Sequence, residues 1–136
     1  MIETKTRVTV DEFHSFIEQP ENVERNFELI DGEIEEKMVS YPYGSQVAKR
    51  IGTFIDGFVI ERNLGYVTTA DGGYIVGKHR FIPDLAFVSY ARMPELIAEK
   101  GYGKIAPDLV VEVISPTDKP RALPKKSTIT ARQGQS

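Results

Sequence analysis

The sequence predicts an α/β domain in which a mixed, curved β-sheet is flanked by helices. Short strand-like runs alternate with two segments of helical periodicity along its 136 residues. The run 109–114 is apolar, rich in β-branched residues and bounded by prolines, which is typical of a central strand. The composition, 40% hydrophobic and 27% charged, is that of an ordinary globular protein. The length is that of one domain.

Composition also bounds the class of protein. The absence of cysteine excludes disulfides and thiolate zinc sites. No apolar run is long enough to span a bilayer, and the N-terminus lacks a secretory signal, so we expect a cytoplasmic protein. A net charge of −3 does not favour a protein that coats nucleic acid. It still allows a nuclease, because acidic metal ligands offset basic phosphate contacts.

Two segments have the pattern of helices. In the first, 9–19, Thr9 and Glu12 fit a capping box and Pro20 ends the helix. Its apolar face holds Phe13, Phe16 and Ile17. The second helix spans 46–62, with Gly52 and Gly57 suggesting a close approach to a sheet. Its predicted apolar face holds Val47, Ile51, Phe54, Ile55, Phe58 and Val59.

The remaining elements are strands joined by turns. Asp31-Gly32 predicts a hairpin between strands 27–31 and 33–39. The glycines at 72 and 73 predict a second hairpin between strands 66–70 and 74–76, and 77–78 is a turn. Strands 81–88 and 108–114 follow, separated by a short helix or loop over 92–100.

A carboxylate within the apolar run 109–114 is the most informative residue. Glu112 would be costly there unless it is paired, hydrogen-bonded, protonated or bound to a metal. A second Pro-Asp stretch, Pro83-Asp84, opens another apolar strand. Two acids on neighbouring strands can share one Mg²⁺, which prefers carboxylate oxygen and retains several waters.

Pro83-Asp84 together with the stretch 107–116, Pro-Asp-Leu-Val-Val-Glu-Val-Ile-Ser-Pro, resembles the Uma-type family of putative restriction endonucleases. This family is part of the PD-(D/E)XK nuclease superfamily. The resemblance runs from about residue 8 to about residue 126. It implies a restriction-endonuclease-like fold and a metal-dependent endonuclease that hydrolyses phosphodiester bonds in nucleic acid, with DNA as the partner.

The resemblance also implies roles for particular residues. Asp84 and Glu112 would hold Mg²⁺ or Mn²⁺ and face one another across neighbouring strands, with the carbonyl of Val113 as a further ligand. Glu33 resembles an auxiliary site residue on the same side, although a solvent-facing strand glutamate explains it equally well. The superfamily's lysine two positions after the glutamate is replaced by Ile114, and the family's helix lysine falls on Lys126.

The end of the chain departs from the family. We expect a domain over 1–118 and a basic, disordered tail over 119–136, which is either solvated or in contact with phosphate. Pro124 disfavours a helix, and the family's closing helix and last strands look missing or replaced, as truncation or a changed reading frame would produce. We therefore expect Lys126 to be poorly positioned, nuclease activity to be weak or absent, and an exposed edge to favour a homodimer or larger oligomer.

A structural interpretation of the same acids stays open. Glu112 would then form a buried ion pair with Lys126, Lys119 or Arg80. Asp84 would accept hydrogen bonds from backbone donors at a bend. The protein would be a catalytically inactive, dimeric binding or interaction protein with a nuclease fold.

Overall fold

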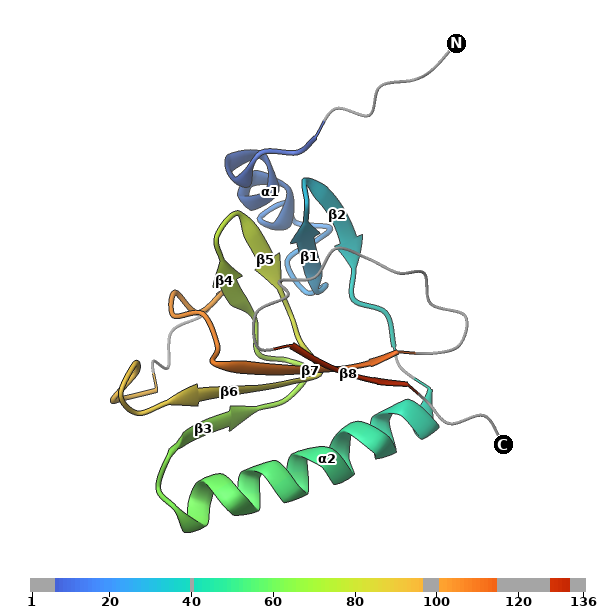
Figure 1. Cartoon of the computed structure of the whole chain (residues 1–136). Helices are drawn as coiled ribbons and strands as arrows, with labels where there is room; N and C mark the ends of the chain where they lie inside the picture. Colours follow the sequence, from blue (N-terminus) through green and yellow to red (C-terminus); the bar gives the residue numbers. More distant parts are fainter. Residues whose placement is uncertain (1–6, 40, 97–100, 115–127, 133–136) are drawn as a thin grey trace.

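The computed structural model describes residues 7–39, 41–96, 101–114 and 128–132. The fold has two four-stranded sheets, each covered by one helix (Figure 1). Sheet A has the strand order β2-β1-β5-β4 and lies beside α1 (Val10–Ile17). Sheet B has the order β3-β6-β7-β8 and lies on α2 (Pro42–Glu61). The prediction of a mixed α/β domain is confirmed, with two sheets in place of one.

Sheet A is antiparallel and built from two hairpins. β1 (Phe27–Ile30) and β2 (Glu33–Glu36) form the first, through Asp31 and Gly32 at φ 50° and 78°, as the sequence predicted. β4 (Tyr74–Val76) and β5 (His79–Phe81) form the second. The outer face of β1 packs on α1 through a cluster of Phe13, Phe27 and Leu29.

The predicted start of α1 is confirmed. The Thr9 hydroxyl accepts a hydrogen bond from the Glu12 N–H at 3.1 Å, and the Glu12 carboxylate accepts from the Thr9 N–H at 3.3 Å. These bonds complete the capping box and satisfy N–H groups that the first helical turn leaves without partners. The helix ends at Ile17, two residues earlier than predicted.

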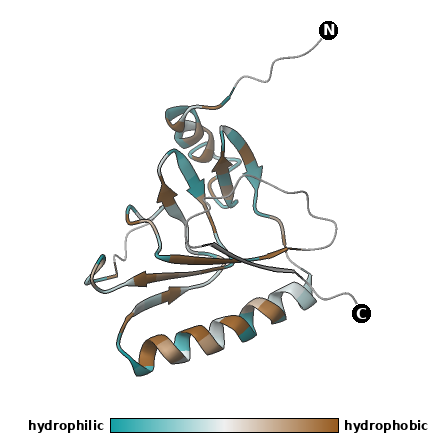
Figure 2. Ribbon diagram, viewed as in Figure 1, coloured by the Kyte–Doolittle hydropathy of each residue, from teal (hydrophilic) through white to brown (hydrophobic). Residues whose placement is uncertain are grey.

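Sheet B is mixed. β3 (Gly65–Thr68), β6 (Leu85–Ser89) and β7 (Leu109–Ile114) are antiparallel neighbours, and β8 (Thr128–Arg132) runs parallel to β7. β8 lies within the segment 119–136 that the sequence suggested as a tail, and its residues 128–132 extend the sheet. Figure 2 shows the apolar residues of β7 at the centre of this layer.

The hairpin predicted around residues 71–73 is wrong. β3 pairs with β6 in sheet B, whereas β4 pairs with β5 in sheet A. A turn does form at Gly72, whose N–H donates to the Thr69 carbonyl at 3.0 Å. The turn signal is local, however, and the partner of each strand is set by packing between distant segments. This turn carries the chain from one sheet to the other.

The helix α2 begins at Pro42, four residues before the predicted start. It packs on β3 and β7. A Cβ added to Gly52 would lie 3.0 Å from Leu85 of β6, so the close approach to a sheet is confirmed at this glycine. Phe54 and Phe58 were predicted on the packed face but are 81% and 52% exposed, because the face in contact with the sheet is narrower than the apolar stripe. No helix in the described ranges is long and apolar enough to cross a membrane.

Candidate metal and nuclease site

The candidate site lies where the chain passes from sheet A to sheet B. Residues 82–84, between β5 and β6, form this corner and belong to neither strand. Pro83 at its centre is fully buried. A proline donates no backbone hydrogen bond, so it suits a corner at which strand pairing is interrupted. The predicted single strand 81–88 is therefore divided here, with Asp84 directly before the first residue of β6.

Two hydrogen bonds tie Asp84 to β7 at Glu112 and Val113. The Asp84 N–H donates to Glu112 Oε1 at 3.0 Å, and the Val113 N–H donates to Asp84 Oδ2 at 2.8 Å. β6 and β7 are antiparallel neighbours, with Leu85 opposite Val111, which places the corner beside Glu112. Glu112 is 6% exposed, so its charge is held away from bulk water and depends on such donors.

A lysine completes this arrangement. Lys37 Nζ lies 3.0 Å from Asp84 Oδ1 and donates to the Ile82 carbonyl at 2.9 Å. The Lys37 side chain is 17% exposed and that of Asp84 12%, so the ion pair is largely shielded from solvent. The Lys37 N–H also donates to the Asn26 carbonyl at 2.8 Å, which extends the β1–β2 hairpin and fixes the backbone of the lysine.

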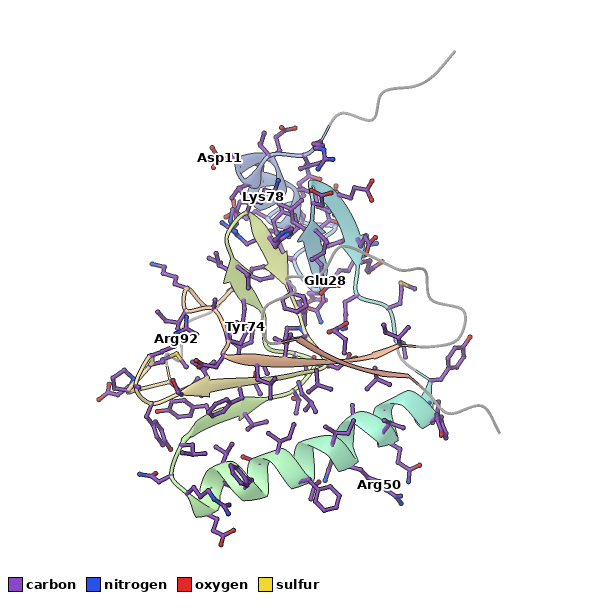
Figure 3. The ribbon with its side chains drawn as sticks, viewed as in Figure 1. Asp11, Glu28, Arg50, Tyr74, Lys78 and Arg92 are labelled. Atoms are coloured by element: carbon purple, nitrogen blue, oxygen red, sulfur yellow. The ribbon has the colours of Figure 1, made fainter. Side chains whose placement is uncertain are left out.

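A further carboxylate contacts the corner from sheet A. Glu28 of β1 is 2% exposed, and its Oε2 accepts a hydrogen bond from the Ile82 N–H at 2.8 Å. Figure 3 shows Glu28 at the end of β1 that faces sheet B. The negative charge of Glu28 adds to burial in raising the pKa of Tyr102 to about 12. The Tyr102 hydroxyl donates to the carbonyl of Phe27, next to Glu28.

The other site residues predicted from the sequence are Glu33, Lys126 and the carbonyl of Val113. Glu33 is exposed at the turn end of β2, opposite Ile30, whereas Glu35 is opposite Glu28. Glu33 thus shares the face of the sheet on which Glu28 lies, at a greater distance along the strand. Lys126 lies outside the described residues. Its role and that of the Val113 carbonyl stay predictions.

The sequence also allowed an ion pair between Glu112 and Arg80, but the contacts of the Arg80 guanidinium lie elsewhere. Arg80 Nη1 donates to the carbonyls of Gly77 and His79, at 3.0 and 3.1 Å. Its Nε faces His14 of α1 at 3.5 Å. Arg80 is opposite Leu29 in the sheet, so its side chain lies on the α1 side, away from the corner. Asp84 does accept a backbone hydrogen bond at a bend, as the structural interpretation predicted.

Sequence reasoning missed Glu28 and Lys37. Glu28 could have been found by the criterion that identified Glu112, because it is a carboxylate inside the apolar run Phe27–Ile30. Lys37 has no such signal. It follows two glutamates at the end of a strand, and only the pairing of the hairpin with the corner shows its contact with Asp84.

The donor set at the corner fits a hard divalent cation that retains waters. Mg²⁺ is commonly bound by one or two carboxylates together with water and substrate phosphate oxygens. Asp84 and Glu112 supply two carboxylates held in fixed positions by backbone donors. In the described ranges, no group of three or more His, Asp or Glu side chains is arranged to hold a metal, so a closed protein cage of such residues is not present there.

Comparison with known proteins gives a consistent result. The model of the family Uma2, "Putative restriction endonuclease", matches residues 10–134. A solved structure described as a putative nuclease belonging to DUF820, from Anabaena variabilis, is similar with a TM-score of 0.64 at 25% sequence identity. The similarity covers 82% of this chain but 61% of that one, so the present chain spans under two thirds of the other's length. Among curated proteins no match was found.

Proposed function

Since the chain belongs to the Uma2 family of putative restriction endonucleases, we propose that it is a divalent-metal-dependent endonuclease that hydrolyses phosphodiester bonds in DNA. The observation that supports this most directly is the pair of hydrogen bonds that ties Asp84 to Glu112 and Val113 of the neighbouring strand. Two carboxylates fixed at one corner are what a Mg²⁺ or Mn²⁺ nuclease requires, because the protein must define the ion's position before substrate arrives.

In this proposal Asp84 and Glu112 hold the cation, and the carbonyl of Val113 is a further ligand. When bound, the metal would polarise the scissile phosphate and lower the pKa of a bound water. The backbone N–H groups of Asp84 and Val113 keep both carboxylates oriented. Lys126 is proposed as a cationic group in addition to the metal. It would stabilise the negative charge that develops on the phosphate during cleavage.

Glu28 is the proposed auxiliary carboxylate. It is buried and contacts the same corner, whereas Glu33, the residue predicted from the sequence, is exposed at the hairpin turn. Glu28→Gln keeps an oxygen for the Ile82 N–H and removes the charge. It should reduce metal-dependent cleavage at least tenfold, whereas Glu33→Gln should leave cleavage within about twofold of wild type. If Glu33→Gln reduced cleavage more than Glu28→Gln does, Glu33 would be the auxiliary residue instead.

The test of the main proposal is cleavage of supercoiled plasmid DNA with Mg²⁺ or Mn²⁺, with an excess of EDTA as the negative control. We expect weak cleavage that requires metal and is lost in Asp84→Asn. A matched control is Asp108→Asn. Asp108 also follows a proline and also accepts a backbone N–H, from Ser89 at 2.8 Å, but at a different place in sheet B.

The variants decide between the two interpretations of Asp84 and Glu112. If Asp108→Asn and Asp84→Asn behave alike in cleavage, Asp84 is a structural aspartate and the proposed site is wrong. If the folded wild-type protein neither cleaves DNA nor binds Mn²⁺, the catalytically inactive, nuclease-fold binding protein is the better description.

We also propose that the protein forms a homodimer or a larger homo-oligomer. The outer face of α2 carries two exposed aromatic side chains one helical turn apart, Phe54 at 81% and Phe58 at 52% exposed. Contiguous apolar surface of this kind often marks a contact between proteins. Light scattering should give a mass above that of one chain, and Phe54→Glu should lower it. A wild-type monomer at all concentrations would contradict the proposal. Cytoplasmic localisation stays a prediction.

A further inference from the structure

Lys37 contacts the carboxylate of Asp84, which the proposed function assigns to the metal. Asp84 Oδ2 accepts the Val113 N–H at 2.8 Å, so this oxygen already has a backbone partner. Its other oxygen, Oδ1, lies 3.0 Å from the Lys37 ammonium. The oxygen of Asp84 that is not bound by the backbone is therefore held by a positive charge of the chain itself.

The position of Lys37 is built into the fold. Its ammonium donates to the Ile82 carbonyl as well as to Asp84, so two acceptors of the corner hold it. Its backbone is fixed by the hydrogen bond to Asn26. The alternation of side chains along β2 directs residues 35 and 37 to the face that carries Glu28, toward sheet B. The lysine therefore occupies this position for reasons that do not depend on a bound ligand.

We infer that Lys37 is an intrinsic counterion that competes with the divalent cation for Asp84. This inference rests on the proposed function. An ammonium and a divalent cation at one carboxylate oxygen repel each other strongly in a site shielded from water. The metal therefore binds only when the Lys37 ammonium leaves Asp84. In the absence of metal, the lysine neutralises the carboxylate, which stabilises the folded chain and weakens the affinity for metal.

A second lysine offers a matched control. Lys78 lies in the β4–β5 turn, 3.8 Å from Asp31 Oδ1, and its side chain is 69% exposed. Figure 3 shows Lys78 at the end of sheet A remote from Glu28. Removing this charge changes the net charge of the protein by the same amount as removing Lys37. It leaves the corner between the sheets unaltered.

The test is the affinity for Mn²⁺, measured by electron paramagnetic resonance of the free ion, for the wild type, Lys37→Met, Lys37→Arg and Lys78→Met. We expect Lys37→Met to bind Mn²⁺ about tenfold more tightly than wild type. Lys37→Arg, which keeps the charge, and Lys78→Met should remain within about twofold of wild type. If Lys37→Met destabilises the fold too far, Lys37→Gln replaces it, because glutamine can still donate to the Ile82 carbonyl.

A measurement on the unaltered protein separates direct competition from a general effect of charge. The ¹⁵Nζ signal of Lys37 should shift and exchange faster with water when diamagnetic Mg²⁺ is added, because the ammonium has left Asp84. The Lys78 signal should not change. Equal Mn²⁺ affinity of wild type and Lys37→Met, or an unchanged Lys37 signal at saturating Mg²⁺, would overturn the competition alone. Absence of Mn²⁺ binding in every variant would overturn the proposed function together with it.

Discussion

Two strands of the molecule each bury one carboxylate, and the two make comparable contacts from opposite sheets. Glu28 of β1 in sheet A accepts the Ile82 N–H, and Glu112 of β7 in sheet B accepts the Asp84 N–H. They hold the two ends of one three-residue corner. The two glutamates differ in how clearly the sequence indicates their burial. Glu112 stands within six strand residues flanked by prolines, whereas Glu28 stands in a run of four beside a prominent turn.

A carboxylate with apolar neighbours on both sides is informative even in a very short strand. The family resemblance pointed to Glu33, which follows the Asp31-Gly32 turn, although that residue is exposed. Burial, and not proximity to a recognisable turn, decides which glutamate must have partners.

The largest effect on stability is expected from Asp84→Ala. It leaves the Val113 N–H without its acceptor and the largely buried Lys37 ammonium without its counterion. Urea denaturation should show a decrease of about 3 kcal/mol in the free energy of unfolding. Asp108→Ala, which removes a more exposed acceptor, should cost about 1 kcal/mol. Equal losses for the two variants would mean that the corner is no more sensitive than an ordinary bend.

The two buried glutamates are compared next. Glu28→Ala and Glu112→Ala each leave one N–H of the corner without its side-chain acceptor, so each should lower the free energy of unfolding by about 1–3 kcal/mol. Glu28→Gln and Glu112→Gln keep an acceptor oxygen and should lose much less. Urea denaturation of the four variants without metal measures this. A loss in the glutamine variants as large as that in the alanine variants would show that charge, and not the hydrogen bond, is what matters.

The smallest effect concerns pH. Burial, with the charge of Glu28 as a lesser cause, raises the pKa of Tyr102 from 10.0 to about 12. The stability that depends on the neutral hydroxyl is fully present below pH 10 and is lost as pH rises from about 10 to about 12, because the unfolded chain releases this proton first. Unfolding measured across this range should show a decline that Tyr102→Phe reduces. The same decline in both proteins would assign it to other groups.

Much of the fold follows from local signals in the sequence. The capping box of Thr9 and Glu12 and the hairpin at Asp31-Gly32 are both present, because each is determined by residues within one turn. The partners of β3 and β4 could not be predicted in this way. Pairing across sheets depends on which segments pack together, and the turn at Gly72 carries no information about that.

In the candidate site too, some residues stand out in the sequence and others do not. Glu112 stands out in the sequence because an acid inside an apolar strand-like run is costly, and Asp84 because its Pro-Asp stretch opens a second such run. Lys37 does not stand out, because its distance to Asp84 depends on the docking of the β1–β2 hairpin against the corner. The exposure of Phe54 on α2 was also missed, since periodicity shows an apolar stripe but not how much of it a neighbour covers.

The central claim is that Asp84 and Glu112 together hold one divalent cation. The most direct measurement is a crystal structure of the protein with Mn²⁺, located by its anomalous scattering. We predict one Mn²⁺ between the two carboxylates, with the Lys37 ammonium moved away from Asp84. Ordered density for Asp84, Glu112 and Lys37 in their present contacts at saturating Mn²⁺, with no anomalous peak between the carboxylates, would contradict it.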